Sequence, residues 1–247
     1  MTAIGIYGSL GRMGQAIAAE LSGMGARHAG GADVTDDAGV LAQAADVLVD
    51  FSSPNALEAH LAAARGAGTP IVIGTTGLSE RHHAAIDDAA REIAVLQTGN
   101  TSLGVTLLAQ LVREAAARLG SDWDIEIAEM HHRHKVDAPS GTALLLGAAA
   151  AAGRGTTRAE VAVNDRAGVT GERSEGTIGF ASLRGGSVVG DHSVIFAGEG
   201  ERIEIVHRAD SRAIFARGAI TAALWLARQP AGRYTMTEVL GTEVLGI

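Results

Sequence analysis

The sequence predicts an α/β protein with two domains: a parallel sheet with helices on both faces, followed by an α+β domain with an open mixed or antiparallel sheet. Three observations lead to this prediction. Apolar strand-like runs alternate with helical segments in the first half, runs of alternating polarity dominate the second half, and glycine turns separate those runs. The chain has 247 residues, 47% of them hydrophobic, which is enough to bury the cores of two small domains.

Each short apolar run of the first half predicts a buried strand, and a helical segment follows it. The expected strands are Ala3–Tyr7, Asp46–Phe51, Pro70–Gly74 and Ile93–Gln97. Met13, Ile17 and Leu21 share one face of the first expected helix. Ser53 and Pro54 predict the start of another helix, with serine as the N-cap and proline in the first turn. Strands that alternate with helices in this way predict a parallel sheet buried on both faces.

The second half predicts a different arrangement, with a domain boundary near Asn100. Long helices are expected over Leu103–Leu119, Gly141–Ala152 and Ile214–Ala227. The expected strands, separated by turns that contain glycine, are Trp123–Glu129, Ala159–Val163, Thr177–Leu183, Ser187–Ala197 and Arg202–Val206. Short strands of alternating polarity joined by such turns predict a mostly antiparallel sheet.

The composition argues against several classes of protein. The net charge is -8 and no cluster of lysine and arginine is present, so nucleic acid is a poor partner. The chain has no cysteine, which excludes disulfides, thiol catalysis and thiolate metal sites. The most apolar run, Leu144–Gly153, has half the length of a membrane span, and no stretch resembles a signal peptide. We therefore expect a cytoplasmic protein that binds neither nucleic acid nor membrane.

A glycine-rich turn, Gly8–Gly14 (GSLGRMG), lies between the first expected strand and the first expected helix. At this place the pyrophosphate of a dinucleotide binds to a helix N-terminus, and Arg12 would reach the phosphates as a charged donor. The middle glycine of the usual motif is Leu10 here, so a tight turn without a ligand is the alternative. In such motifs an acidic residue about 20 positions further on binds the adenosine ribose.

Asp33, which lies 22 residues after Gly11, is the first candidate for that acidic residue, and Asp36 and Asp37 are alternatives. Two further turns, Gly74–Gly77 and Thr98–Thr101, each follow an expected parallel strand. Loops at the carboxyl edge of a parallel sheet line its ligand crevice, although each of these two could also be an ordinary turn.

The segment His131–Thr142 (HHRHKVDAPSGT) concentrates side chains that can transfer protons or bind anions. Three of the nine histidines and the only lysine among 20 basic residues lie between His131 and Lys135. Lysine can release its proton near neutral pH, whereas arginine cannot, so this position is expected to need an ammonium group. Ser140 can cap the following helix, whose free N–H groups favour an anion. The combination suits a small anionic substrate that gains a proton.

A metal site made by His131, His132 and His134 is the alternative for this segment. Adjacent histidines on an extended chain point to opposite faces, and no H-E-x-x-H pattern accompanies them. We therefore expect no metal here. A solvated run of cations is the second alternative, but this run leads directly from a strand into a helix start.

Together these motifs resemble the 4-hydroxy-tetrahydrodipicolinate reductase family, also called dihydrodipicolinate reductase. Glu129–Leu144 (EMHHRHKVDAPSGTAL) is similar to the family signature. Supporting matches run along nearly all of the chain: GSLGRMG, VDFSSPNALEAHL, IVIGTTG, NTSLGV, GERSEGTIGFASLRGG and ERIEIVHRADSRAIFARGA. The resemblance implies reduction of 4-hydroxy-tetrahydrodipicolinate to tetrahydrodipicolinate, with NADH or NADPH, in lysine and diaminopimelate biosynthesis.

The resemblance also implies an architecture: a Rossmann-like dinucleotide-binding domain over residues 1–101, a substrate-binding and tetramerisation domain over 102–212, and a C-terminal segment, 213–247, that returns to the first domain. Open sheets of the second domain would assemble a homotetramer. Two departures from the family pattern are Leu10, where glycine is usual, and Thr101, where an aromatic residue is common.

Residue roles follow from the resemblance in the same way. His131 would be the proton donor and acceptor, and Lys135 a proton donor. His132, Ser140, Gly141 and Thr142 would bind the substrate, a cyclic imine dicarboxylate. The residues expected to bind the cofactor are Gly8, Ser9, Leu10, Gly11, Arg12, Met13, Asp33, Gly74, Thr75, Thr76, Thr98, Gly99, Asn100 and Thr101.

Two other classes of function stay open on the sequence. A different NAD-linked enzyme of the same fold, such as an imine or aspartate dehydrogenase, has no need of the HHRHK and PSGT segments. A non-catalytic NAD-binding or regulatory protein has no need of His131 and Lys135.

We expect kcat/KM with NADH to be at least as large as kcat/KM with NADPH. The reason is that Asp33 has acidic neighbours, Asp36 and Asp37, which would repel a 2′-phosphate, and no arginine follows it. Initial rates measured with each cofactor over a range of concentrations check this expectation. A clear preference for NADPH would contradict the role given to this loop.

Overall fold

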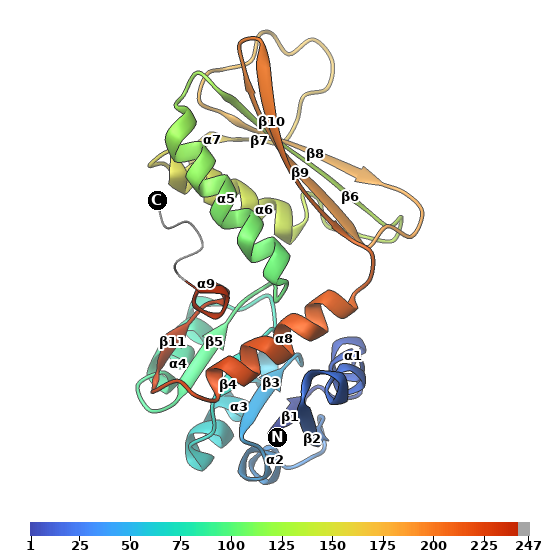
Figure 1. The fold of residues 1–247 in the computed structure, drawn as a ribbon, viewed down its shortest axis with the longest axis vertical. Helices are drawn as coiled ribbons and strands as arrows, with labels where there is room; N and C mark the ends of the chain where they lie inside the picture. The colour runs from blue at the N-terminus through green and yellow to red at the C-terminus, as the bar shows by residue number, and fades with distance from the viewer. Residues whose placement is uncertain (242–247) are drawn as a thin grey trace. The chain divides into compact units, whose positions relative to one another are not determined.

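The computed structural model describes residues 1–241, and the chain divides into two compact units (Figure 1). Unit 1 combines Met1–Leu103 with the chain from Arg212 onward, and unit 2 comprises Gly104–Ser211. The expected C-terminal segment, residues 213–247, includes residues 242–247, which lie outside the described residues. Within the described residues, no helix is long and apolar enough to cross a membrane.

Unit 1 is built on a six-stranded parallel sheet in the order β11-β5-β4-β3-β1-β2. Its strands are β1 (Thr2–Tyr7), β2 (Ala26–Ala32), β3 (Val47–Asp50), β4 (Ile71–Ile73), β5 (Ala94–Gln97) and β11 (Gly232–Tyr234). The strand β1 pairs with β2 on one side and with β3 on the other, so the strand order reverses beside β1. The crevice outside the carboxyl ends of strands at such a point is where open parallel sheets bind ligands.

Helices cover both faces of this sheet, as expected for a parallel sheet. On one face, Ile17 of α1 (Arg12–Glu20) and Ile220 of α8 (Ala213–Leu226) pack with Ile4 and Val49 of the sheet. The other face is covered by α2 (Ala38–Ala44), α3 (Pro54–Ala67) and α4 (Glu80–Ala89). The 3₁₀ helix η1 (Ser22–Met24) precedes β2, and α9 (Met236–Leu240) follows β11. Together with the sheet of unit 2, this confirms the predicted fold class.

Unit 2 contains a five-stranded sheet in the order β10-β9-β6-β8-β7. Its strands are β6 (Asp124–His131), β7 (Ala162–Val163), β8 (Ile178–Arg184), β9 (Gly190–Gly198) and β10 (Glu201–Ala209). One face packs against α5 (Leu103–Leu119) and α6 (Gly141–Gly153), with Leu146 and Val112 of these helices against Ile127 and Phe196 of the sheet. The sheet is mixed, in agreement with the predicted open mixed or antiparallel sheet: β10, β9 and β6 pair antiparallel, whereas β8 pairs parallel with β6 and with β7. The crossover that parallel strands require is made through α6 and α7.

The expected strand over Ala159–Val163 is wrong in its first part. Residues 158–161 form the short helix α7 (Arg158–Val161), and only β7 is extended. The cause is a capping box, in which the side chain of Glu160 accepts a hydrogen bond from the backbone N–H of Thr157 at 2.9 Å. The sequence T-x-x-E that makes this cap outweighs an alternation only five residues long.

Candidate functional site

The glycine-rich turn joins β1 to α1 at the carboxyl edge of the unit 1 sheet. Gly8 has a φ of +76°, and a Cβ there would lie 2.7 Å from the carbonyl oxygen of Phe51, so only glycine fits. Gly11 is the N-cap of α1, and among the described residues no side chain caps this helix. The first N–H groups of α1 are therefore available to an anion. The side chain of Leu10 is 75% exposed, which explains how leucine fits where the usual motif has glycine.

Asp33 follows β2 directly, and its carboxylate lies against this turn. It accepts a hydrogen bond from the Ser9 hydroxyl at 2.6 Å and one from the Leu10 backbone N–H at 3.2 Å. The carboxylate of Asp36 accepts from the Asp33 backbone N–H at 2.9 Å, and Asp37 caps α2. The two alternatives are thus engaged in local turns, and the geometry favours Asp33 as the acidic residue beside the glycine turn.

The loops after β4 and β5 lie at the same edge of the sheet. Thr98 donates its backbone N–H to the Ile73 carbonyl at 3.0 Å, which joins the two loops. The Asn100 backbone N–H donates to the Thr98 hydroxyl at 3.1 Å. Thr101 is buried, and its hydroxyl donates to the Phe215 carbonyl of α8 at 2.7 Å. The side chain of Thr101 therefore anchors the loop to α8 and does not point out of the loop.

In unit 2, the rows of side chains across the sheet explain where the polar site begins. The strand β6 buries every second residue, namely Ile125, Ile127, Glu129 and His131. In the neighbouring strands, β8 and β9, Ile127 has Phe180 and Val194 as partners. One row further, Glu129 lies between Ser182 of β8 and His192 of β9. In the row after that, His131 pairs with Arg184 of β8. The polar site is thus the direct continuation of the apolar face of the sheet.

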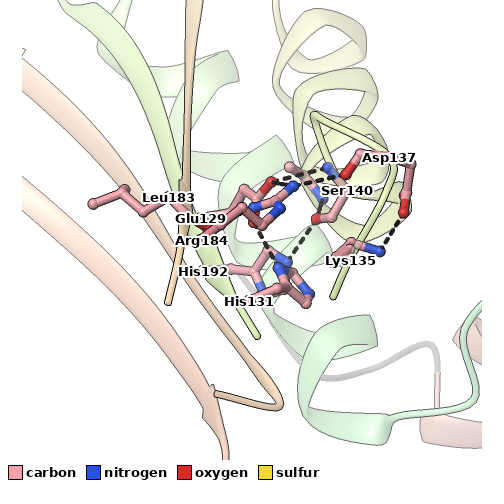
Figure 2. Close-up of polar contacts among 9 residues, drawn as sticks. Glu129, His131, Lys135, Asp137, Ser140, Leu183, Arg184 and His192 are labelled. Atoms are coloured by element: carbon pink, nitrogen blue, oxygen red, sulfur yellow. Dashed lines mark hydrogen bonds and ion pairs between the residues drawn. The ribbon is translucent and has the colours of Figure 1, made fainter. Parts of the chain in front are cut away.

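The carboxylate of Glu129, with a side chain only 1% exposed, lies at the centre of this site (Figure 2). Arg184 binds both of its oxygens, Nη1 to Oε2 and Nη2 to Oε1, each at 2.8 Å. Oε2 also accepts from His131 Nδ1 at 2.6 Å, and Oε1 from the backbone N–H of Ser140 at 3.2 Å. Burial raises the pKa of Glu129, but hydrogen bonds from Arg184, His131 and Ser182 outweigh this and lower the pKa to about 2. Glu129 is therefore ionised near neutral pH.

This carboxylate fixes the proton arrangement of His131. An ionised carboxylate only accepts hydrogen bonds, so Nδ1 of His131 carries a proton and Nε2 is the nitrogen that can exchange one. A Cβ at Gly190 would lie 3.0 Å from this Nε2, so the absence of a side chain at Gly190 leaves room for the ring. The His131 residue is 8% exposed. An imidazole held in this way by a carboxylate can exchange a proton at its other nitrogen.

Ser140 is the N-cap of α6, as expected, and its hydroxyl accepts from the Ala143 backbone N–H at 3.2 Å. The same oxygen lies 3.0 Å from Nε2 of His192. Burial lowers the pKa of His192 to about 4, with a further contribution from His131, so this ring is neutral near pH 7. Gly141 and Thr142 form the first turn of α6, where free N–H groups favour an anion.

Lys135 lies in the loop between β6 and α6. Its ammonium group pairs with Asp137 Oδ1 at 2.8 Å, and the hydrogen bond from Lys135 lowers the pKa of Asp137. The loop is held to the Arg184–Gly186 turn, because Arg184 Nη2 donates to the Asp137 carbonyl at 2.7 Å and the Gly186 carbonyl accepts from the Arg133 backbone N–H at 3.3 Å. The Lys135 ammonium group therefore belongs to a loop that is held in place by the end of β8 and the turn that follows it.

The alternative of a histidine metal site gains no support from the geometry. The rings of His132 and His134 are 6.3 Å apart and tilted by 39°, while His131 is engaged with Glu129. Across residues 1–241, no group of three or more histidine, aspartate or glutamate side chains is arranged to hold a metal ion.

Three central residues were not singled out from the sequence: Glu129, Arg184 and His192. A signal for two of them was present. Glu129 follows Ile125 and Ile127 in the alternation of β6, and His192 precedes Val194 and Phe196 in that of β9. A polar residue at an apolar register position predicts a buried group that needs partners. For Arg184, next to two glycines, the sequence offers no comparable signal.

Comparison with known proteins identifies the relatives of the chain. Residues 2–101 match the model of the N-terminus of dihydrodipicolinate reductase, and residues 104–240 match that of its C-terminus. The chain is 58% identical over 245 residues to 4-hydroxy-tetrahydrodipicolinate reductase of Zymomonas mobilis subsp. mobilis, and the match covers 96% of this chain and 96% of the relative. It is 49% identical over 260 residues to the enzyme of the same name from Ruegeria sp., covering 96% of this chain and 97% of the relative.

A solved structure shares the fold. Dipicolinate-bound dihydrodipicolinate reductase from Paenisporosarcina sp. TG-14 superposes with a TM-score of 0.74 at 22% identity, over 96% of this chain and 98% of that chain. The scyllo-inositol dehydrogenase of Lactobacillus casei with bound NAD(H) and scyllo-inositol is more distant, with a TM-score of 0.56 at 14% identity over 97% of this chain and 93% of that chain.

Replacing Glu129 should change the proton position on His131. In Glu129→Gln the amide can present an N–H group to Nδ1, so the ring is expected to shift its proton to Nε2. Ring ¹⁵N chemical shifts of histidine-labelled protein measure this directly. The matched control is Glu126→Gln, on the opposite face of the same strand, which should leave the His131 signals in place. Unchanged His131 signals in Glu129→Gln would contradict the hydrogen bond as the determinant.

Proposed function

Because the chain belongs to the dihydrodipicolinate reductase family, it reduces 4-hydroxy-tetrahydrodipicolinate to tetrahydrodipicolinate with NADH or NADPH in lysine and diaminopimelate biosynthesis, and we propose that the residues described above carry out this reaction. One observation carries the assignment of residues. The buried Glu129 carboxylate binds both the ring of His131 and the backbone N–H of Ser140, at 2.6 and 3.2 Å. A proton donor and an anion-binding helix start are thereby held by one group.

The cofactor binds at the carboxyl edge of the unit 1 sheet in this proposal. The N–H groups at the start of α1, with Gly8–Met13, hold the pyrophosphate, and Asp33 holds the adenosine ribose. The loops Gly74–Thr76 and Thr98–Thr101 contact the remaining half of the dinucleotide. When bound, NADH or NADPH supplies the hydride that the reaction needs.

A substrate carboxylate binds at the start of α6 in this proposal, to Ser140, Gly141 and Thr142, with His132 as a further contact. The tautomer of His192 supports this role for Ser140. Nδ1 of His192 is buried without a partner among the described residues, and a buried N–H without a partner is rarer than a buried acceptor without one. Nε2 therefore carries the proton and donates to Ser140 Oγ, which also accepts from Ala143. The hydroxyl proton of Ser140 is left to donate to the carboxylate.

Proton transfer in this proposal belongs to His131 and Lys135. The hydroxylated substrate must lose its hydroxyl group as water, which leaves a conjugated ring. Addition of a hydride to this ring would leave an electron-rich, enamine-like centre that takes up a proton. His131 offers that proton from Nε2, since its Nδ1 is held by Glu129. Lys135 provides a compact ammonium group that can also release a proton, and it stabilises negative charge on the dicarboxylate.

Lys135→Arg should keep the fold and NADH binding but lose kcat. Arginine keeps the charge, yet its proton is too tightly bound and its head group is wider and planar. General acid catalysis contributes typically 10²–10⁴-fold, so we expect a loss on the order of 10²-fold or more. The assay mixes protein, NADH and the product of aspartate semialdehyde–pyruvate condensation and follows the loss of NADH absorbance. Lys135→Ala should lose at least as much and also bind substrate more weakly.

The control for this variant is Arg133→Ala, which removes an exposed cation two residues away and should leave kcat close to that of the unaltered protein. Near-normal turnover of Lys135→Arg would reduce Lys135 to an electrostatic anchor and leave His131 as the donor. Absence of turnover by the unaltered protein would overturn the proposed function itself.

We also propose that the protein is a cytoplasmic homotetramer, assembled through the unit 2 sheet. Two exposed apolar side chains on the sheet face opposite the helices support the assembly, namely Leu183 of β8, 51% exposed, and Val206 of β10, 44% exposed. The strand β10 ends the sheet order, so its outer edge is free to pair or to be covered. Light scattering at micromolar concentration should give four times the 25.1 kDa chain mass. A monomeric mass would refute this assembly.

A further inference from the structure

A second buried carboxylate, Asp50, lies at the carboxyl end of β3 and is fully buried. Its Oδ1 accepts hydrogen bonds from the backbone N–H of Ser52 at 2.9 Å, from the Ser52 hydroxyl at 2.6 Å and from the Thr75 hydroxyl at 3.0 Å. Its Oδ2 accepts from Nδ1 of His60 at 2.8 Å. A carboxylate has about four acceptor sites, so Asp50 is saturated by the protein and is not itself a ligand-binding group.

These bonds join three separate parts of unit 1. Ser52 belongs to the loop between β3 and α3, Thr75 to the loop after β4, and His60 to α3. The backbone of Asp50 adds a fourth tie, because its carbonyl accepts from the Gly74 N–H at 2.9 Å. One residue therefore sets the relative positions of two neighbouring loops at the ligand edge of the sheet.

The ring of His60 is itself fixed. It stacks on the fully buried ring of Tyr7, with 3.9 Å between centroids and 9° between planes. Tyr7 donates its hydroxyl to the Ala38 carbonyl at 2.8 Å, and burial, followed by the charge of Asp50, raises the pKa of this phenol. The Asp50–His60 pair is thus braced by β1 and by the start of α2.

Stability alone does not account for this arrangement. Taking a carboxylate out of water is costly, and apolar groups of the same shape often give a fold that is equally stable or more so. The rest of β3 is Val47, Leu48 and Val49, all fully buried. A polar cluster at the ligand end of this strand therefore indicates a need for fixed loop positions.

We propose that Asp50 is a positioning residue for the dinucleotide, holding the Ser52 and Thr75 loops where they fit its nicotinamide half. The order of the strands supports the assignment of these two loops to the nicotinamide half. Asp33 follows β2 and the glycine turn follows β1, so adenosine and pyrophosphate occupy that side, while β3, β4 and β5 end on the other side. The inference rests on the proposed cofactor site and adds a residue that does not touch the cofactor.

The test compares two ligands by calorimetric titration: NADH, and ADP as a probe for the adenosine and pyrophosphate subsite alone. Asp50→Asn should weaken NADH binding about tenfold or more, as expected when one charge-assisted hydrogen bond is lost, while ADP affinity changes less than about twofold. The matched control is Asp46→Asn. Asp46 directly precedes β3 at the end opposite Asp50, and it accepts a hydrogen bond from the Ala3 N–H at 2.7 Å. Removing its charge should leave both affinities unchanged.

Equal weakening of NADH and ADP by Asp50→Asn, or no weakening of NADH, would overturn the inference. If Asp50→Asn does not fold, His60→Phe decides, because it keeps a ring stacked on Tyr7 while it removes the hydrogen bond to Asp50 and the longer contact, 3.4 Å, with the Ser52 hydroxyl. It should weaken NADH more than ADP, and an unchanged ratio of the two affinities would overturn the inference. Failure of the proposed function is seen separately, as absence of NADH binding or turnover in the unaltered protein.

Discussion

The buried charge of Glu129 is the constraint on which the unit 2 site depends. A carboxylate that takes an apolar position in a sheet must be compensated, since an unpaired buried charge costs several kcal/mol in real proteins. Compensation here comes from Arg184, His131 and the backbone of Ser140. The requirement to neutralise one charge therefore also fixes the orientation of the His131 ring and of the start of α6.

Asp50 shows the same principle in unit 1. Both carboxylates lie near the carboxyl end of a strand, on a face that is otherwise apolar, and each is shared by segments distant in sequence. The physical reason is directional. Apolar contacts tolerate small displacements, whereas hydrogen bonds to a buried charge weaken steeply with angle and distance. Polar residues at these two positions give up some apolar packing, and in return they hold the neighbouring segments in well-defined positions.

Much of the fold follows from the sequence because its signals are local. The strands β1, β3, β4 and β5 are continuous apolar runs, and Ser140 marks the start of α6. By contrast, β2 (Ala26–Ala32) contains two glycines and two exposed polar side chains, and its pairing with β1 decides its conformation. Likewise, the parallel pairing of β6 with β8 depends on a crossover that no local pattern encodes. Where the neighbouring strand decides the conformation of a segment, the sequence of that segment alone does not predict it.

The residues of the unit 2 site divide in the same way, into those that a local pattern reveals and those that strand pairing brings in. His131, Lys135 and Ser140 share one short segment, so their chemistry can be read from the sequence. Arg184 lies 55 positions from Glu129, and His192 lies 52 positions from Ser140. Strand register brings them together, because Glu129 pairs with His192 across β9 and His131 pairs with Arg184 across β8. A slip of one residue would turn these side chains to the opposite face of the sheet. The register of β8, β6 and β9 therefore determines this site as much as the side chains themselves do.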